Sequence, residues 1–372
     1  MKVCILSLPL NWNYGGILQQ FALQKILKDM GHSVTLLSRR KSRNLIFKAL
    51  VLFKWGLWVS SLSKIKWLRE RIPTLAVECF KRNYLDIAKD SFSGKSLNSL
   101  AAEADVFIVG SDQVWNPDAC PDLENYFFDF IEQGSRSKKI AYAASFGKDT
   151  FEINPKRISK ITSLIQDFDA ISLREDSGVS ILSKTFDITD AEVLPDPVLL
   201  LESKVYSSII GNKAQKKKQL FAYILDQTEE KREFIDSVAN TLNLEVYYFL
   251  PLKEHAQSKE TYSYEKECTV ENFLSGFRDS TFVITDSFHG TLFSLIFNVH
   301  FLSFGNEERG STRFENILKK VKLLNRLISP VEDIGQCNDQ INWDDVNLVL
   351  KTQRELGNNF IKKHIDGIPR EI

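Results

Sequence analysis

The sequence predicts an α/β protein with two Rossmann-like domains that face each other across a cleft, and three observations predict this class. The 372 residues exceed what one hydrophobic core usually serves. Short apolar runs alternate with helical patterns, as in parallel sheets covered by helices. A lysine-rich break at residues 211–218 interrupts the alternation. We therefore expect an N-terminal domain at 1–210, a C-terminal domain at 211–342 and a helical tail at 343–372.

The first 38 residues have the pattern of a strand, a helix and a second strand. The apolar run Lys2–Leu8 predicts a buried strand, and a turn at residues 11–16 joins it to a helix with apolar residues at helical spacing. Gly31 ends that helix, and Ser33–Leu37 predicts the next strand. Further N-terminal strands are expected at Val106–Val109, Lys139–Ala144, Ala170–Leu173 and Glu192–Leu194.

The alternation restarts after the lysine-rich break. Strands are expected at Leu220–Leu225, Glu245–Phe249, Phe282–Thr285 and Phe301–Phe304, and helices are expected to begin at Glu229, Val270, Thr291 and Phe314. Polar residues follow most of the strands, and α/β proteins bind their ligands beyond the carboxyl ends of parallel strands. Two such domains with a shared cleft form the arrangement called GT-B in glycosyltransferases.

Composition bounds the partners and the compartment. The 48 basic and 48 acidic residues cancel, so nothing in the overall charge predicts nucleic acid as a partner. The five cysteines have neither metal-ligand nor disulfide spacing, which favours a reducing cytoplasm. The opening MKVCILSLPL has a short apolar run with Pro9 in it, and we interpret it as the first strand and not as a signal peptide.

The stretch from Asp286 to Gly290 is the strongest candidate for chemistry. It follows an apolar run and precedes a predicted helix, so it lies where a ligand would bind. His289 has the setting of a proton donor near neutral pH, with Ser287 beside it. A structural role in the core or as a cap is the alternative. No clustered histidines or other spacing predicts a metal site.

Two N-terminal turns are candidates for substrate contacts. The first, Asn13, Tyr14, Gly15 and Gly16, would cradle an anion at a helix start, although its glycines are also explained by turn geometry. The second follows the strand at Val106–Val109 and offers carboxylate, amide, hydroxyl and indole groups that suit a sugar acceptor. The alternative is that this second turn needs its residues for shape alone. Its members are Ser111, Asp112, Gln113, Trp115 and Asn116.

Arg174 directly follows the predicted strand Ala170–Leu173. A guanidinium at this edge of the sheet can clamp a carboxylate or a phosphate through two N–H groups. A salt bridge to Glu175 or Asp176 is the other interpretation. The position at the carboxyl end of a strand favours the clamp.

The segment at residues 39–71 is basic and aromatic. It has ten Lys or Arg residues against one acid, Glu70, and it includes Trp55, Trp58 and Trp67. Its apolar part is too short to span a bilayer. Basic residues mixed with Trp and Leu are typical of a helix that lies on an anionic membrane surface, and an ordinary amphipathic helix on the sheet is the alternative.

The order and spacing of several motifs together resemble the polysaccharide pyruvyl transferase family. The motifs are NYGGILQQFALQKIL, VGSDQVWNP, YAASFG, SLRE, LPDPVLLL and TDSFHGTLFSLIFN. The resemblance implies a GT-B-like enzyme that moves the enolpyruvyl unit of phosphoenolpyruvate onto two hydroxyls of a sugar, as a cyclic ketal, with no metal or other cofactor.

The resemblance also suggests roles for individual residues. It implies that Arg174 contacts the phosphoenolpyruvate anion and that His289 contacts the donor as the candidate acid. Some members have an Arg and a Leu before that histidine, where this chain has Ser287 and Phe288. We expect Arg313 to supply the missing charge and Asp112 to act as a base for the acceptor hydroxyl.

The leading hypothesis is a bacterial, cytoplasmic enzyme that modifies a lipid-linked sugar intermediate of a capsule or exopolysaccharide on the inner face of the plasma membrane. A GT-B glycosyltransferase that uses a nucleotide sugar is one alternative. A non-catalytic sugar-binding or assembly protein of the same fold is another.

Overall fold

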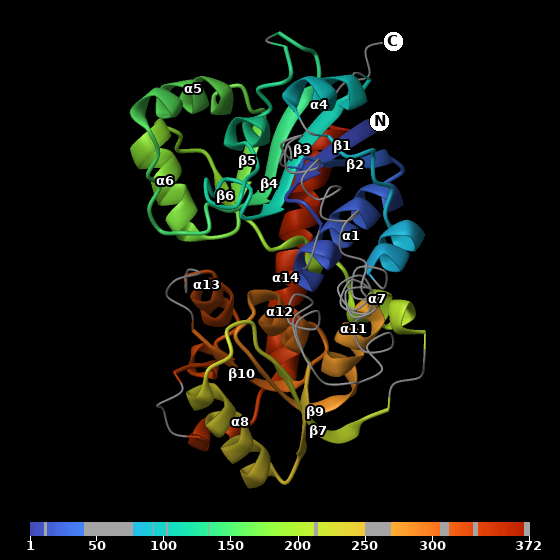
Figure 1. Cartoon of the computed structure of the whole chain (residues 1–372), viewed down its shortest axis with the longest axis vertical. Helices are drawn as coiled ribbons and strands as arrows, with labels where there is room; N and C mark the ends of the chain where they lie inside the picture. The colour runs from blue at the N-terminus through green and yellow to red at the C-terminus, as the bar shows by residue number, and fades with distance from the viewer. Residues whose placement is uncertain are drawn as a thin grey trace, which may run out of the picture.

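The computed structural model is drawn in Figure 1, where the two domains lie one above the other. The structure describes residues 1–10, 13–40, 77–91, 93–101, 103–132, 134–211, 215–249, 269–305, 312–329 and 334–367. Most of the basic aromatic segment, residues 41–71, lies outside the described residues. Its first two residues are described and engaged, because Arg39 donates a hydrogen bond to Asn125 over 2.6 Å and Arg40 pairs with Asp90 at 2.8 Å.

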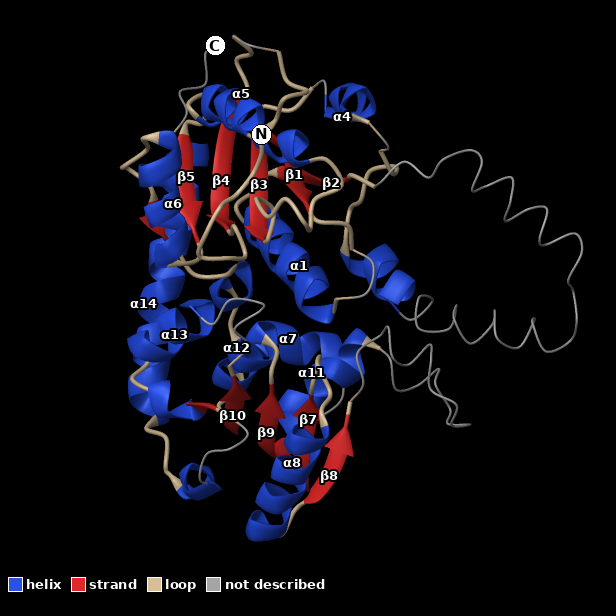
Figure 2. Cartoon of the chain, turned by 60° about the vertical axis from the view of Figure 1, so that its left-hand side comes forward, coloured by secondary structure: helices blue, strands red, loops and turns tan. Residues whose placement is uncertain are grey.

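Six parallel strands form the N-terminal sheet in the order β2-β1-β3-β4-β5-β6. Its strands are β1 (Lys2–Ser7), β2 (Ser33–Ser38), β3 (Val106–Asp112), β4 (Lys138–Ala144), β5 (Ala170–Leu173) and β6 (Glu192–Val193). The helices around it are α1 (Tyr14–Asp29), α4 (Gly94–Ala101), α5 (Pro155–Ile165) and α6 (Asp176–Phe186). All six strands expected in this domain are confirmed, with ends that differ by up to three residues (Figure 2).

The C-terminal sheet has five parallel strands in the order β11-β10-β9-β7-β8. Its strands are β7 (Lys217–Tyr223), β8 (Glu245–Tyr248), β9 (Ser280–Thr285), β10 (His300–Phe304) and β11 (Leu327–Ile328). Its helices are α8 (Glu229–Leu242), α11 (Val270–Asp279), α12 (Phe288–Ile296) and α13 (Thr312–Lys320). Strand β11 was not expected, because its two residues are too short for a periodic signal.

The start of α12 differs from the sequence prediction in a way that matters for the site. The helix was expected from Thr291, but it begins at Phe288. The Ser287 side chain caps it by accepting a hydrogen bond from the Gly290 N–H over 3.3 Å. His289 therefore lies in the first turn of a helix and not in a loop.

Two connecting pieces tie the domains together. The short helix η2 (Pro197–Leu200) and α7 (Ser203–Ile210) lead from the first domain to the second. Helix α14 (Trp343–Ile361) then runs back along both domains, as the views in Figures 1 and 2 agree. It reaches the N-terminal sheet, where Phe360 packs edge-on against Tyr142 at 6.1 Å between ring centroids.

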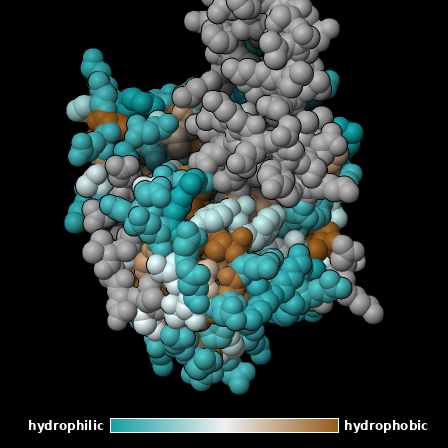
Figure 3. Space-filling view, turned by 60° about the horizontal axis from the view of Figure 1, so that its bottom comes forward, coloured by the Kyte–Doolittle hydropathy of each residue, from teal (hydrophilic) through white to brown (hydrophobic). Residues whose placement is uncertain are grey.

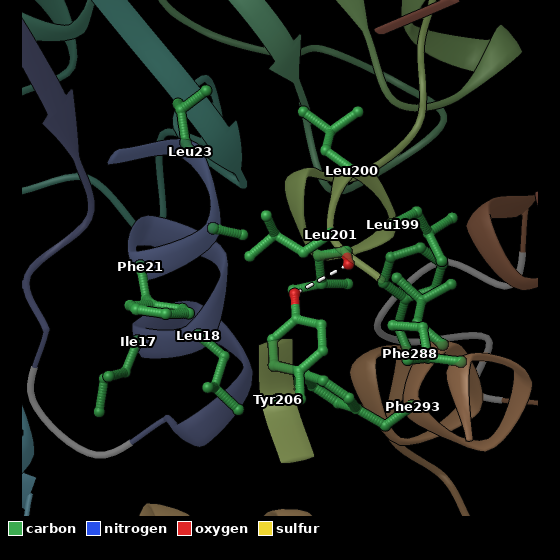
Figure 4. Close-up of a cluster of buried hydrophobic side chains, with 14 of the residues drawn as sticks. Ile17, Leu18, Phe21, Leu23, Leu199, Leu200, Leu201, Tyr206, Phe288 and Phe293 are labelled. Atoms are coloured by element: carbon green, nitrogen blue, oxygen red, sulfur yellow. Dashed lines mark hydrogen bonds between the residues drawn. The ribbon is translucent and has the colours of Figure 1, made fainter. Parts of the chain in front are cut away.

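One hydrophobic core runs through the junction between the domains. Figure 4 shows α1 on one side and α12 on the other, with η2 and Tyr206 between them. Tyr206 is fully buried and donates a hydrogen bond to the Val198 carbonyl over 2.8 Å. This continuous core fixes the carboxyl ends of the two sheets close to each other.

Hydrophilic side chains predominate on the face in Figure 3, and its hydrophobic spots are small. Among the described helices, none is both long and apolar enough to cross a bilayer.

Candidate functional site

The turn between β9 and α12 is held rigidly by buried hydrogen bonds. Asp286 is 2% exposed and accepts from the Leu225 and Asp226 N–H groups over 2.6 and 3.0 Å and from the Lys231 ammonium over 2.7 Å. The Ser287 N–H donates to Thr285 Oγ1 over 3.1 Å. These bonds fix the backbone from which His289 projects. Ser287 acts in this turn as a helix cap.

His289 faces the N-terminal domain. Its Nε2 lies 3.5 Å from Oδ2 of Asp196, and its ring packs against Gly15 at the start of α1. A Cβ atom at position 15 would lie 2.2 Å from Nδ1 of His289. Glycine is required there because any side chain would collide with the imidazole. The two helix starts predicted as ligand sites are thus in direct contact.

Arg174 meets the same carboxylate from the end of β5. Its side chain is 1% exposed, and Nη1 donates to Oδ2 of Asp196 over 3.1 Å. Its Nε lies 3.5 Å from Glu175, so the predicted salt bridge to Glu175 is also present. Among the described residues, Nε and Nη2 of Arg174 have no hydrogen-bond partner. A buried guanidinium with N–H groups to spare is suited to bind an anion.

Asp196 is the central residue of this site. It follows a predicted strand, as the other polar strand ends do, but it was not among the candidate site residues. Its Oδ2 accepts from Gln19 Nε2 over 2.5 Å and from Arg174, while its Oδ1 accepts from the Val198 N–H over 3.1 Å. Burial would raise the pKa of Asp196, but His289, Arg174 and the Val198 N–H outweigh burial and hold that pKa at about 2. We refer to Gln19, Arg174, Asp196 and His289 as the interdomain polar cluster.

A signal for Asp196 was present in the sequence. It lies in LPDPVLLL, after a predicted strand and between two prolines, which fix the backbone on either side. Gln19 had no comparable signal, because a glutamine inside a helix is ordinarily a surface residue. Here Gln19 is fully buried.

Phe288 brings a second arginine close to the cluster. The Arg174 guanidinium lies 4.9 Å from the centroid of the Phe288 ring, and the Arg313 guanidinium of α13 lies 5.5 Å from it. The second positive charge expected near His289 is therefore present in Arg313, which belongs to α13 and not to the turn before His289. Arg313 also lines a small crevice between the domains, together with Ser145, Gly147, Lys148, Asp149, Glu175, Ser177 and Thr312.

Asn13 caps the start of α1, and Tyr14 in the first turn departs from expectation. The exposed Asn13 accepts from the Gly16 N–H over 3.3 Å, and Gly15 and Gly16 follow in the first turn. Tyr14 was predicted to contact substrate, but it is fully buried and stacks on Phe273 at 4.8 Å between centroids. We correct its role to packing between the domains.

The predicted turn at residues 111–116, whose first two residues form the end of β3, is divided between surface and core. Asp112 is partly exposed, has a left-handed backbone with φ of 68°, and lies near Gly16, where an added Cβ would be 3.5 Å from its Oδ2. Gln113 is partly exposed and accepts from Asn116 over 2.9 Å. Asp112 and Gln113 are thus accessible to an acceptor, whereas Asn116 is buried, at 6% exposure.

Two other residues of this turn are structural, contrary to expectation. Trp115 is fully buried, stacks on Phe127 at 5.1 Å between centroids and donates to the Tyr126 carbonyl over 3.1 Å. Its indole face is therefore not open to a sugar ring. Ser111 is also fully buried and donates to the Ala143 carbonyl over 3.0 Å. In the described part of the chain, no group of three His, Cys, Asp or Glu residues is placed to hold a metal ion.

Solved structures share this architecture. The UDP-GlcNAc 2-epimerase of Methanocaldococcus jannaschii aligns with a TM-score of 0.51 and 10% identity, over 97% of this chain and 99% of the epimerase. A UDP-N-acetylglucosamine 2-epimerase of Rickettsia bellii (TM-score 0.45, 10% identity, 99% and 100% covered) and MurG of Acinetobacter baumannii (TM-score 0.45, 8% identity, 99% and 99% covered) also align. The first alignment and the two parallel sheets confirm the GT-B fold.

Sequence comparison gives the family. No curated protein matches the chain significantly. The family model described as polysaccharide pyruvyl transferase matches residues 13–308, which include the whole interdomain polar cluster. The chain therefore belongs to the polysaccharide pyruvyl transferase family.

Proposed function

We propose that this protein transfers the enolpyruvyl unit of phosphoenolpyruvate to two hydroxyls of one sugar, which forms a cyclic pyruvate ketal and releases phosphate. The observation that supports this most is the meeting of Arg174 and His289, from different domains, at one buried carboxylate oxygen. A donor with two anionic groups needs fixed positive charge, and its methylene carbon needs an acid. Arginine and histidine are the side chains that supply these.

The proposed reaction balances without a metal or redox partner. His289 protonates the methylene carbon, and an acceptor hydroxyl adds to the neighbouring carbon while its proton passes to Asp112. The C–O bond to phosphate then breaks, and the second hydroxyl adds at the same carbon. Asp112 passes the proton of the first hydroxyl to the departing phosphate, and the proton of the second hydroxyl replaces the one lost by His289. Arg174 holds the donor through charge-assisted hydrogen bonds.

Arg313 is the proposed second anion contact. Its position beside Phe288 would let it reach a phosphate or carboxylate that Arg174 already holds. A cation–π contact in a partly desolvated site contributes about 1–2 kcal/mol, enough to orient the guanidinium. The proposal includes the amide of Gly15 and the positive end of the α1 dipole as further contributions to this field, while the Gly16 N–H is taken by the Asn13 cap.

The proposed acceptor is a sugar of a lipid-linked intermediate in surface-polysaccharide synthesis, bound near Asp112, Gln113 and Asn116. The proposed location is the cytoplasmic face of the plasma membrane, with the segment at 39–71 on the anionic surface. Replacing Trp55 and Trp58 by Ser should weaken sedimentation with anionic vesicles. Unchanged sedimentation would leave that segment without a membrane role.

The test is an assay of phosphate release. With phosphoenolpyruvate and a panel of sugar acceptors, the wild-type protein should release phosphate only when an acceptor is present. His289→Gln and Arg174→Gln should each lower turnover by about 100-fold or more, as expected for loss of an acid or of an anion clamp. Release of nucleotide from a panel of nucleotide sugars would instead identify a glycosyltransferase. Inactivity with every donor would favour a binding or assembly role.

A further inference from the structure

Asp196 has no role in the proposed reaction, although it contacts each of the other three residues of the interdomain polar cluster. Its side chain is 0% exposed. It lies between the domains, with Gln19 and Arg174 on the N-terminal side and His289 on the C-terminal side. A buried carboxylate of this kind is costly to desolvate, so its partners must compensate for the cost.

The hydrogen bonds of Asp196 require a carboxylate and not an amide. Both oxygens accept: Oδ1 from the Val198 N–H, and Oδ2 from Gln19 and Arg174. An asparagine has one accepting oxygen, so in either orientation its NH₂ group would face an N–H donor. The backbone around Asp196 is also anchored, because Tyr142 donates to the Pro195 carbonyl over 3.2 Å.

Asp196 faces the two groups that the proposed reaction uses. Arg174 Nη1 is at 3.1 Å and His289 Nε2 is at 3.5 Å from the same oxygen. At that distance the carboxylate attracts an Nε2 that bears a proton, and the packing of the ring against Gly15 limits how the imidazole can turn. With Nη1 held by Asp196 and Nε paired with Glu175 at 3.5 Å, Nη2 is the part of the guanidinium that has no partner among the described residues and can donate to another anion.

We infer that Asp196 is a positioning residue that orients Arg174 and His289 toward one substrate anion and keeps a proton on Nε2 of the histidine. The inference rests on the proposed function for the identity of that anion. The geometry of the four side chains carries the rest. Asp196 touches no reacting atom and acts through its two partners.

Asp279 offers a matched control. It is also buried, at 7% exposure, and pairs with Arg278 through both oxygens, at 2.8 and 3.0 Å. It also accepts a backbone N–H, from Gln215 over 3.3 Å. It directly precedes β9, at the amino end of that strand, so it lies at the edge of the sheet opposite to the site. Asp279→Asn breaks an equivalent pair away from the chemistry.

The kinetic test compares Asp196→Asn with Asp279→Asn. Both should lower the midpoint of urea unfolding. Only Asp196→Asn should lower kcat for phosphate release from phosphoenolpyruvate, by about 100-fold at saturating donor, since it disorders the acid and the clamp together. If kcat falls no further in Asp196→Asn than in Asp279→Asn, Asp196 is only structural.

A second measurement needs no substrate. The measurement is an NMR spectrum of protein labelled with ¹⁵N-histidine. The His289 signals are assigned as those that disappear in His289→Gln. In wild-type protein, the Nε2 signal of His289 should have the chemical shift of a nitrogen that carries a proton. In Asp196→Asn this signal should move toward that of an unprotonated nitrogen, and in Asp279→Asn it should not. An identical spectrum in both variants would overturn the inference. Wild-type protein that releases no phosphate would instead overturn the proposed function, while the spectra still decide the role of Asp196.

Discussion

The first turns of α1 and α12 are capped in the same way but have different roles in the site. Each helix begins with a side chain that caps it by accepting a hydrogen bond over 3.3 Å from the N–H of a glycine in the first turn. Asn13 accepts from Gly16 in α1, and Ser287 accepts from Gly290 in α12. The α12 start carries His289 on a turn fixed by buried bonds. The α1 start contributes Gly15, which leaves room for that imidazole. One domain therefore supplies a functional group where the other supplies space.

This difference shows how a two-domain site can close. Arg174 and His289 are 5% and 6% exposed, so both are shielded from water in this structure. The packing of the His289 ring against Gly15 closes the contact between the two helix starts. Exclusion of water strengthens every charge interaction inside the site.

Of the changes that test this comparison, filling the space at α1 has the largest expected effect. Gly15→Ala would place a Cβ 2.2 Å from Nδ1 of His289 and force the two helix starts apart. We expect kcat to fall by about 100-fold, because a displacement of about 1 Å has that effect on aligned groups. Gly16→Ala is the control, since its Cβ would make an ordinary contact of 3.5 Å with Asp112. Equal activity of the two variants would show that the contact is not needed for turnover.

The fold could be predicted from the sequence because strands and helices have local signals. Ten strands followed from apolar runs, and each was found within three residues of its expected ends. The site could be predicted only where a residue follows a strand, as Arg174 does. Trp115 and Tyr14 were misplaced for one reason: aromatic residues suit both a sugar site and a core, and only the tertiary packing decides between them. Gln19 and Asp196 meet across 177 positions, a contact that no local pattern encodes.

Acid should remove the stabilisation that the charge of Asp196 gives to the interdomain polar cluster. The pKa of Asp196 is about 2, below the ordinary value near 3.9, so its charge stabilises the folded state fully above about pH 4. That stabilisation, on the order of 2 kcal/mol, should disappear as the pH falls from about 4 to 2. Chemical denaturation at successive pH values measures it. The free energy of unfolding of Asp196→Asn should change less with pH over this range than that of wild type. Parallel pH profiles would show that the charge of Asp196 does not stabilise the fold.

The smallest expected effect separates the two caps. Ser287→Ala should lower the free energy of unfolding by about 1 kcal/mol, because its loss leaves the buried N–H of Gly290 without its partner. Asn13→Ala should cost only about 0.5 kcal/mol, since Asn13 is exposed and water can replace its side chain. Urea denaturation of both variants at neutral pH gives the two values. The reverse order would mean that the α1 start, and not the α12 start, is the more rigid wall of the site.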